Sequence, residues 1–319
     1  MKPSAEEAHR TLDRRPFHSE LRALARWLPR GLGRPWIVKL MRYLPIPAVK
    51  LPKGINVHGY SIGGSRSVAV RVITPIEKGV PRPAILWLHG GGFVMGSAKQ
   101  DDRTCARLAD LLQAVVISVD YRLAPEHPYP AALEDCYAAY EYLHRAATSL
   151  HIDSSRIAVV GQSAGGGLAA SLIQMIRDRG DPMPALQMLS YPMLDDKTVL
   201  KPVNDALHRL WDSSSNRFGW ACYLAMAPGG VDVPDYAVPM RLKDLSKLAP
   251  AWIGVGTHDL FYDEDVKYAQ RLEQAGVEVH LEIIEGAFHG FDLAAPNALI
   301  SKRFFELQVA ALAQAFRKF

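Results

Sequence analysis

From residue 84 onward, short apolar runs alternate with longer amphipathic segments, and this alternation most constrains the fold of the chain. The short runs are rich in Val, Ile and Leu and fit strands, whereas the longer segments repeat apolar residues at helical spacing. The expected strands are 84–88, 114–119, 156–160, 185–190, 251–255 and 277–284, and the expected helices are about 100–112, 130–147, 164–179, 262–275 and 296–318. Such alternation predicts an α/β fold, a mostly parallel sheet with helices on both faces.

Two segments lie outside this alternation. Residues 55–62 and 67–73 alternate apolar and polar side chains around Gly63-Gly64-Ser65, which predicts two antiparallel strands and brings the sheet to eight strands. Residues 193–235 are rich in Ser, Asp and Pro. An insertion between two strands usually lies above the sheet, where ligands bind, so we expect this segment near the functional site.

Residues 1–50 differ from the rest of the chain in charge. They hold 11 Lys and Arg against 4 Asp and Glu, whereas the remainder holds 26 against 29. Apolar residues recur between the arginines at helical spacing, which indicates amphipathic helices with an Arg-rich outer face. Nucleic-acid binding or a membrane-surface role would also suit a basic segment. No nucleic-acid reader motif accompanies the charge, so we expect helices packed on the body and no nucleic-acid partner.

The composition, 49% hydrophobic and 22% charged, is that of an ordinary globular protein. No stretch reaches the roughly 18 apolar residues of a membrane-spanning helix, and no apolar run near the start resembles a secretory leader. The cysteines Cys105, Cys136 and Cys222 match neither a metal-ligand nor a disulfide pattern, which favours free thiols in a reducing compartment. We therefore expect a cytoplasmic protein with no stable membrane insertion and no metal.

The segment Gly161-Gln162-Ser163-Ala164-Gly165 follows an apolar strand and opens a helix. This arrangement is typical of a nucleophile elbow, in which the sharp turn excludes side chains at the flanking glycines. The helix N-terminus beneath the serine favours developing negative charge. A glycine-rich strand-to-helix turn without chemistry is the alternative, and the pattern favours Ser163 as a nucleophile.

The segment His89-Gly90-Gly91-Gly92-Phe93 directly follows the expected strand 84–88. Consecutive glycines leave backbone N–H groups unshielded, so the loop can direct them at an oxyanion. Together with the N–H of Ala164, those of Gly91 and Gly92 would form a hole with three donors. The alternative, a phosphate-binding loop, would require a following Lys, which this chain lacks.

A serine nucleophile needs a base, and the base needs an acid that orients it. Asp259 lies just past the expected strand 251–255, and His289 lies just past the expected strand 277–284. The ends of parallel strands meet at one edge of a sheet, so we predict these two residues as acid and base. The rival acids are Asp263, Glu264, Asp265 and Asp292, and the rival bases are His127 and His258.

These motifs together resemble the hormone-sensitive lipase family of bacterial esterases, in the α/β-hydrolase superfamily. The resemblance runs from about residue 50 to the C-terminus through His89–Phe93, Asp120–Asp135, Gly161–Gly166, Tyr191-Pro192, Asp259-Leu260 and Phe288–Phe291. It implies Ser163 as nucleophile, His289 as base and Asp259 as orienting acid. It also implies Gly91, Gly92 and Ala164 as oxyanion donors.

The resemblance further implies how the chain is divided. Residues 51–192 and 236–319 would form the catalytic α/β-hydrolase domain. Residues 1–50 and the insertion 193–235 would form a helical cap over the acyl pocket.

The implied activity is that of a serine carboxylesterase, without cofactor, acting on short- to medium-chain acyl esters through an acyl-enzyme. Amides, lactones and carbamates share the same tetrahedral intermediate, so an amidase, lactonase or carbamate hydrolase is an alternative. A non-catalytic small-molecule receptor is a further alternative, against which His289 argues. Gln162 and Gly167 depart from the family, where Asp or Glu and Asn are usual, and a changed substrate preference or pH profile would follow.

Aromatic side chains in the two cap segments would narrow an apolar pocket, although core packing explains them equally well. The candidate pocket residues are Phe93, Trp36, Trp211, Trp220 and Tyr191. Strand 277–284 alternates and is expected at a sheet edge, where it could pair with a second copy. This pattern predicts a homodimer.

Overall fold

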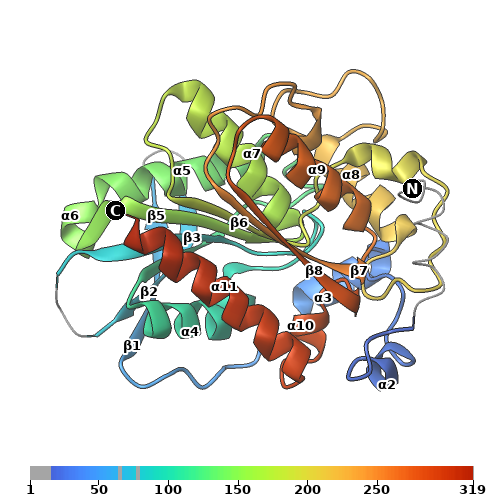
Figure 1. Cartoon of the computed structure of the whole chain (residues 1–319), viewed down its shortest axis with the longest axis horizontal. Coiled ribbons are helices and arrows are strands. Elements are labelled where there is room, and N and C mark those ends of the chain that lie inside the picture. The colour runs from blue at the N-terminus through green and yellow to red at the C-terminus, as the bar shows by residue number, and fades with distance from the viewer. Residues whose placement is uncertain (1–15, 64–66, 77–79, 319) are drawn as a thin grey trace.

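In the part of the chain that the structure describes, eight strands form one sheet in the order β1-β2-β4-β3-β5-β6-β7-β8 (Figure 1). The structure is a computed structural model, and it describes residues 16–63, 67–76 and 80–318. The pairs β1–β2 and β2–β4 are antiparallel and the remaining pairs are parallel, which confirms the predicted sheet. The strands are β1 Ile55–Ile62, β2 Val68–Pro75, β3 Arg82–Leu88, β4 Val115–Asp120, β5 Ile152–Gln162, β6 Leu186–Ser190, β7 Ala251–His258 and β8 Val279–Phe288.

Helices cover both faces of the sheet (Figure 1). On one face lie α5 (Ala131–Arg145), α7 (Ala164–Arg179) and α9 (Tyr262–Gln274), and on the other lie α4 (Asp102–Leu112) and α11 (Leu299–Arg317). The remaining helices are α2 Arg22–Ala25, α3 Pro35–Tyr43, α6 Ala147–Leu150, α8 Ser213–Leu224, α10 Phe291–Ala294 and the 3-10 turns η1 Ala98–Asp101, η2 Asp196–Leu200 and η3 Pro239–Arg241. The two layers confirm the predicted α/β fold.

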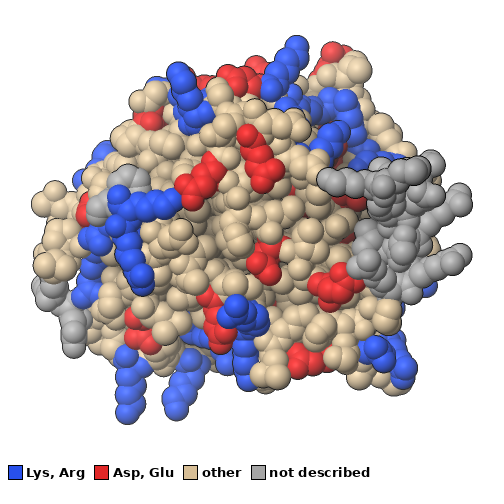
Figure 2. Space-filling view, viewed as in Figure 1, with Lys and Arg blue, Asp and Glu red and all other residues tan. Residues whose placement is uncertain are grey.

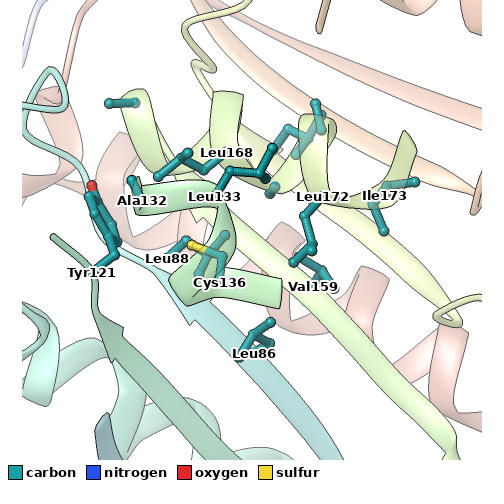
Figure 3. Packing of buried hydrophobic residues seen from close by; sticks show 14 of the residues in the cluster. Leu86, Leu88, Tyr121, Ala132, Leu133, Cys136, Val159, Leu168, Leu172 and Ile173 are labelled. Atoms are coloured by element: carbon teal, nitrogen blue, oxygen red, sulfur yellow. The ribbon is translucent and has the colours of Figure 1, made fainter. Parts of the chain in front are cut away.

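The buried side chains of the central strands divide between two hydrophobic clusters. Leu86 and Leu88 of β3 pack with α5 and α7, whereas Ile85 and Trp87 pack on the α4 and α11 side. Figure 3 shows the first cluster, with Leu133 of α5 among the side chains over the sheet. Because successive strand residues point to opposite faces, a strand buried on both faces must be apolar throughout.

The N-terminal segment pairs with the insertion between β6 and β7. The Leu32 N–H donates to the Leu210 carbonyl at 3.0 Å, and the Leu210 N–H donates to the Pro29 carbonyl at 2.9 Å. The Gly33 N–H donates to Ser215 Oγ at 2.9 Å. Two segments that are far apart in the sequence thus form one layer; residues 1–15 of the expected cap lie outside the described residues.

The last strand differs from its expected range of 277–284. It pairs with β7 to the level of His258 and Phe288, after a register shift between Gly256 and His258. The strand continues past this irregularity and ends at Phe288, beyond the expected end at residue 284. His289 follows directly. β8 is an outermost strand of the sheet, as predicted.

The cysteines are free thiols, with Cys105 and Cys136 buried and Cys222 half-buried. Within the described ranges, the helices are all too short or too polar to cross a bilayer. On the face drawn in Figure 2, basic and acidic side chains are interspersed, so this face presents no continuous basic surface.

Candidate active site

Ser163 occupies the turn between β5 and α7, in a backbone conformation with φ +54° and ψ −120°. A Cβ atom on Gly161 would lie 2.1 Å from the Gly165 carbonyl oxygen, and one on Gly165 would lie 2.2 Å from the Leu88 carbonyl oxygen. Both positions therefore require glycine. The Ser163 N–H donates to the Ser190 carbonyl at 2.9 Å, which fixes the turn against β6.

The structure brings Ser163, His289 and Asp259 into one hydrogen-bonded chain. Ser163 Oγ lies 2.9 Å from His289 Nε2, and His289 Nδ1 lies 2.8 Å from Asp259 Oδ2. Asp259 Oδ1 accepts from the Phe261 N–H at 2.9 Å, so both carboxylate oxygens are engaged. A carboxylate only accepts, so the proton lies on Nδ1 and Nε2 is left to accept the serine proton. All three side chains are buried.

The rival acids lie outside this chain of hydrogen bonds. Glu264 accepts from two backbone N–H groups at 2.7 and 3.1 Å, and burial raises its pKa to about 8. Asp265 is fully buried, its oxygens have no donor among the described residues, and burial raises its pKa well above the usual range. Asp263 lies half-buried on α9, and Asp292 accepts from the Tyr191 hydroxyl at 2.8 Å.

The rival bases are also elsewhere. His127 is exposed, in the loop before α5. His258 is buried and packs edge-on against Phe17, with the ring centroids 5.3 Å apart. Of the three histidines predicted as base or rival base, only His289 therefore contacts Ser163.

The loop after β3 adopts a backbone conformation that favours glycine. Gly91 has φ +132° and Gly92 has φ +61°, and in the described part of the chain their N–H groups have no acceptor. A Cβ on Gly92 would lie 2.0 Å from Trp211 Cη2. The Ala164 N–H, in the first turn of α7, likewise has no partner within its helix. The three predicted donors thus lie on the two loops that meet at Ser163.

His89 supports the loop from behind. Its ring stacks on Tyr121 at 4.1 Å between centroids, and its Nδ1 donates to the Gly90 carbonyl at 2.8 Å. Burial lowers the pKa of His89 to about 4, so the imidazole is neutral at physiological pH.

A cavity of about 650 Å³ opens beside Ser163 and His289. Two of the predicted pocket residues, Tyr191 and Trp211, line it. Its apolar wall is contributed mainly by the N-terminal segment and the insertion, through Leu32, Met41, Leu44, Ile46 and Leu210. Among the described residues, no group of three His, Cys, Asp or Glu side chains could hold a metal ion.

Three predicted pocket residues do not line the cavity. Trp36 is 65% exposed, because helix α3 directs Val38 into the core and Met41 toward the cavity, and Trp36 lies on the opposite face. Phe93 and Trp220 are buried behind the glycine loop, with ring centroids 5.3 Å apart. Phe93 has φ +65°, which turns its side chain into the core rather than toward the substrate. The prediction for these three side chains is wrong.

The sequence reasoning missed Arg42. Its Nε donates to the Val94 carbonyl at 2.6 Å, a second guanidinium nitrogen donates to the Ala124 carbonyl, and a third contacts Glu126 at 2.8 Å. This side chain therefore ties α3 to the loop that follows Gly92. The sequence contained one signal for this role, because Arg42 directly follows Met41 and lies on the same inward side of the amphipathic helix.

The chain is similar to proteins of a known family. A family profile described as alpha/beta hydrolase fold matches residues 85–293. Esterase LipI of Mycobacterium tuberculosis is 38% identical over 213 residues, which cover 66% of this chain and 65% of LipI. Carboxylesterase NlhH of the same species is 36% identical over 259 residues, 79% of this chain and 80% of NlhH.

Solved structures of esterases are similar to this chain over nearly its whole length. A bacterial heroin esterase superposes with a TM-score of 0.83 at 36% identity, covering 94% of this chain and 98% of the other. Esterase LipW from Mycobacterium marinum superposes with a TM-score of 0.81 at 34% identity, covering 98% of both chains.

Proposed function

The chain belongs to the alpha/beta hydrolase family and is a carboxylic ester hydrolase, and we propose that it is a serine esterase that uses Ser163, His289 and Asp259. The observation that carries the proposal is the hydrogen-bonded chain at 2.9 and 2.8 Å from Ser163 Oγ through His289 to Asp259. The predicted resemblance to the hormone-sensitive lipase family and the predicted fold are confirmed.

The proposed reaction is acyl transfer in two steps. His289 Nε2 accepts the proton of Ser163 as Oγ attacks the ester carbonyl, and the negative oxygen is stabilised by the N–H groups of Gly91, Gly92 and Ala164. His289 then gives its proton to the leaving alcohol. Water attacks the acyl-enzyme by the same route and releases the acid.

Short- to medium-chain esters are the proposed substrates. The cavity of about 650 Å³ is of the size that holds a small ligand rather than a long-chain triglyceride. Residues 16–50 and 193–235, which we propose as the cap, supply much of its apolar wall, and residues 51–192 and 236–318 supply the proposed catalytic groups. The carbonyl carbon must lie within reach of Ser163 Oγ, so Trp211 above Gly92 restricts the bulk next to it.

The test is the Ser163→Ala variant, assayed with 4-nitrophenyl butyrate and with a fluorophosphonate probe. We expect turnover to fall by about 10⁵-fold or more and labelling to disappear, with an unchanged circular dichroism spectrum. Ser154→Ala, at an exposed serine on β5, is the matched control. Wild-type turnover in Ser163→Ala would refute the proposal. A panel of anilides and lactones, assayed beside the esters, separates an esterase from an amidase or a lactonase.

A further inference from the structure

The cavity has an acidic floor on the side of α4 and α11. Asp101, the last residue of η1, lines the cavity and is 4% exposed. Its Oδ2 accepts from Trp87 Nε1 at 2.8 Å, and in the described part of the chain it forms no ion pair. Burial raises the pKa of Asp101 to about 7, although hydrogen bonds from Trp87 and Gln100 oppose the shift.

A second carboxyl group lies close to the first. Asp292, in α10, accepts from the Tyr191 hydroxyl at 2.8 Å, and Tyr191 lines the cavity beside His289. The two carboxyl groups are near enough that the charge of Asp292 raises the pKa of Asp101 further. Like Asp101, Asp292 forms no ion pair with a Lys or Arg of the described residues.

The second polar group that lines this floor is Gln162. Ala158 and Val160 of β5 point to the α4 and α11 side, so Gln162, two residues further, points to the same side as Trp87. Gln162 lines the cavity and is 2% exposed, and its Oε1 accepts no hydrogen bond from the described residues. A buried acceptor without a donor is unfavourable, and a ligand that donates a hydrogen bond would remove that penalty.

Basic groups at the cavity do not neutralise this floor. Arg42 lines the cavity, but its guanidinium is engaged by Glu126 and by two backbone carbonyls. His289 donates through Nδ1 to Asp259 and faces Ser163 through Nε2. The floor is therefore an acidic and hydrogen-bond-accepting surface within an otherwise apolar cavity.

On the premise of the proposed esterase function, we propose that Asp101 and Gln162 bind a protonated amine carried by the ester. The charge of Asp292, which does not itself line the cavity, assists them, and the three residues are named here the acidic recess. The N–H of a tertiary ammonium would donate to the carboxylate of Asp101, and a primary or secondary ammonium would donate a second N–H to Gln162 Oε1. The ester carbonyl would meanwhile lie at Ser163. The enzyme would then prefer amino esters to neutral esters of the same shape.

The experiment compares esters that differ by one atom. On the alcohol side, 2-(dimethylamino)ethyl butyrate is compared with 3-methylbutyl butyrate. On the acyl side, ethyl 4-(dimethylamino)butyrate is compared with ethyl 5-methylhexanoate. The readout is the ratio of kcat/KM for the amine to that for its neutral isostere at pH 7.5, which cancels any general loss of activity.

We expect this ratio to exceed about tenfold for at least one pair in the wild type, the effect of one charged hydrogen bond. Asp101→Asn, which keeps the shape of the side chain, should lower that ratio about tenfold. Asp110→Asn, an acid of α4 that does not line the cavity, is the matched control and should keep the wild-type ratio. Equal ratios in the wild type and Asp101→Asn for both pairs would overturn the inference.

If Asp101→Asn fails to fold, inhibition of the wild type by the two alcohols still tests the inference. In the hydrolysis of 3-methylbutyl butyrate, 2-(dimethylamino)ethanol should inhibit competitively at about a tenfold lower concentration than 3-methylbutanol. Equal inhibition by the two alcohols, together with a kcat/KM ratio near one for the acyl-side pair in the wild type, would also overturn the inference. Hydrolysis of the neutral esters without amine preference refutes the acidic recess alone, whereas no hydrolysis of any ester refutes the proposed function itself.

Discussion

Replacing Asp259 with Asn should lower kcat about 10⁴-fold, equivalent to about 5.4 kcal/mol in the activation free energy. The magnitude follows from the two engaged oxygens of Asp259. Oδ1 accepts from the Phe261 N–H at 2.9 Å, and Oδ2 faces His289 Nδ1 at 2.8 Å. An asparagine side chain has one acceptor oxygen, and the fixed backbone N–H of Phe261 would donate to it.

The amide NH₂ of the variant then faces His289 and donates to Nδ1. The ring responds by placing its proton on Nε2, which faces Ser163 Oγ at 2.9 Å. A protonated Nε2 cannot accept the serine proton, so the nucleophile loses its base while the geometry is preserved. The oxyanion donors remain in place, which leaves the residual rate above that of water.

The assay is kcat for 4-nitrophenyl butyrate at pH 7.5, with urea denaturation to show that the fold survives. Asp263→Asn on α9 is the matched control, because this rival acid lies near Asp259 in the sequence but outside the hydrogen-bonded chain. A loss smaller than about tenfold in Asp259→Asn would refute the assigned role of this acid. A larger loss in the control than in Asp259→Asn would transfer the role to Asp263.

Three other perturbations test separate parts of the structure. Gly92→Ala places a methyl group 2.0 Å from Trp211 at a φ of +61°, so kcat for 4-nitrophenyl butyrate should fall about 10²- to 10³-fold, and an unchanged kcat would exclude this N–H as a donor. Burial raises the pKa of Glu264 from 4.5 to about 8, so the folded protein retains a proton that the unfolded chain releases, and stability falls as pH rises through this window. Glu264→Gln should therefore make the urea midpoint decline less between pH 5 and 8 than in the wild type, and a parallel decline would contradict this. We also propose that the edge strand β8 pairs with β8 of a second copy to form a homodimer, so the wild type should have a dimeric mass in light scattering. Ile283→Lys, at an exposed position of β8, should be monomeric. A monomeric wild type would refute the dimer.

The sequence was sufficient to predict the residues that the strand ends position. Ser163, Asp259 and His289 each follow an apolar run, and parallel strands deliver their carboxyl ends to one edge of the sheet. The glycines on either side of Ser163 also indicated the sharp turn, because Gly161 and Gly165 have no room for a Cβ. These predictions depend on local chain geometry and on one topological rule.

The cavity wall could not be predicted in the same way. The rotation of α3 about its axis decides that Met41 faces the cavity and Trp36 faces solvent, and that rotation is set by contacts with distant segments. Phe93 follows the glycine loop directly, yet its positive φ sends the ring into the core. Asp101 lies at the cavity with its carboxylate bonded to Trp87 of β3, and no local sequence pattern predicts that contact between β3 and η1.

The backbone bonds between Leu32 and the insertion also set an order of events during synthesis. Leu32 leaves the ribosome long before Leu210, and at roughly 5–20 residues per second the interval between them is on the order of ten seconds or more. During that interval the apolar face of α3, with Val38 and Met41, has no insertion beside it. The nascent chain thus exposes the apolar side chains of this helix to chaperones until about two thirds of the chain has been translated.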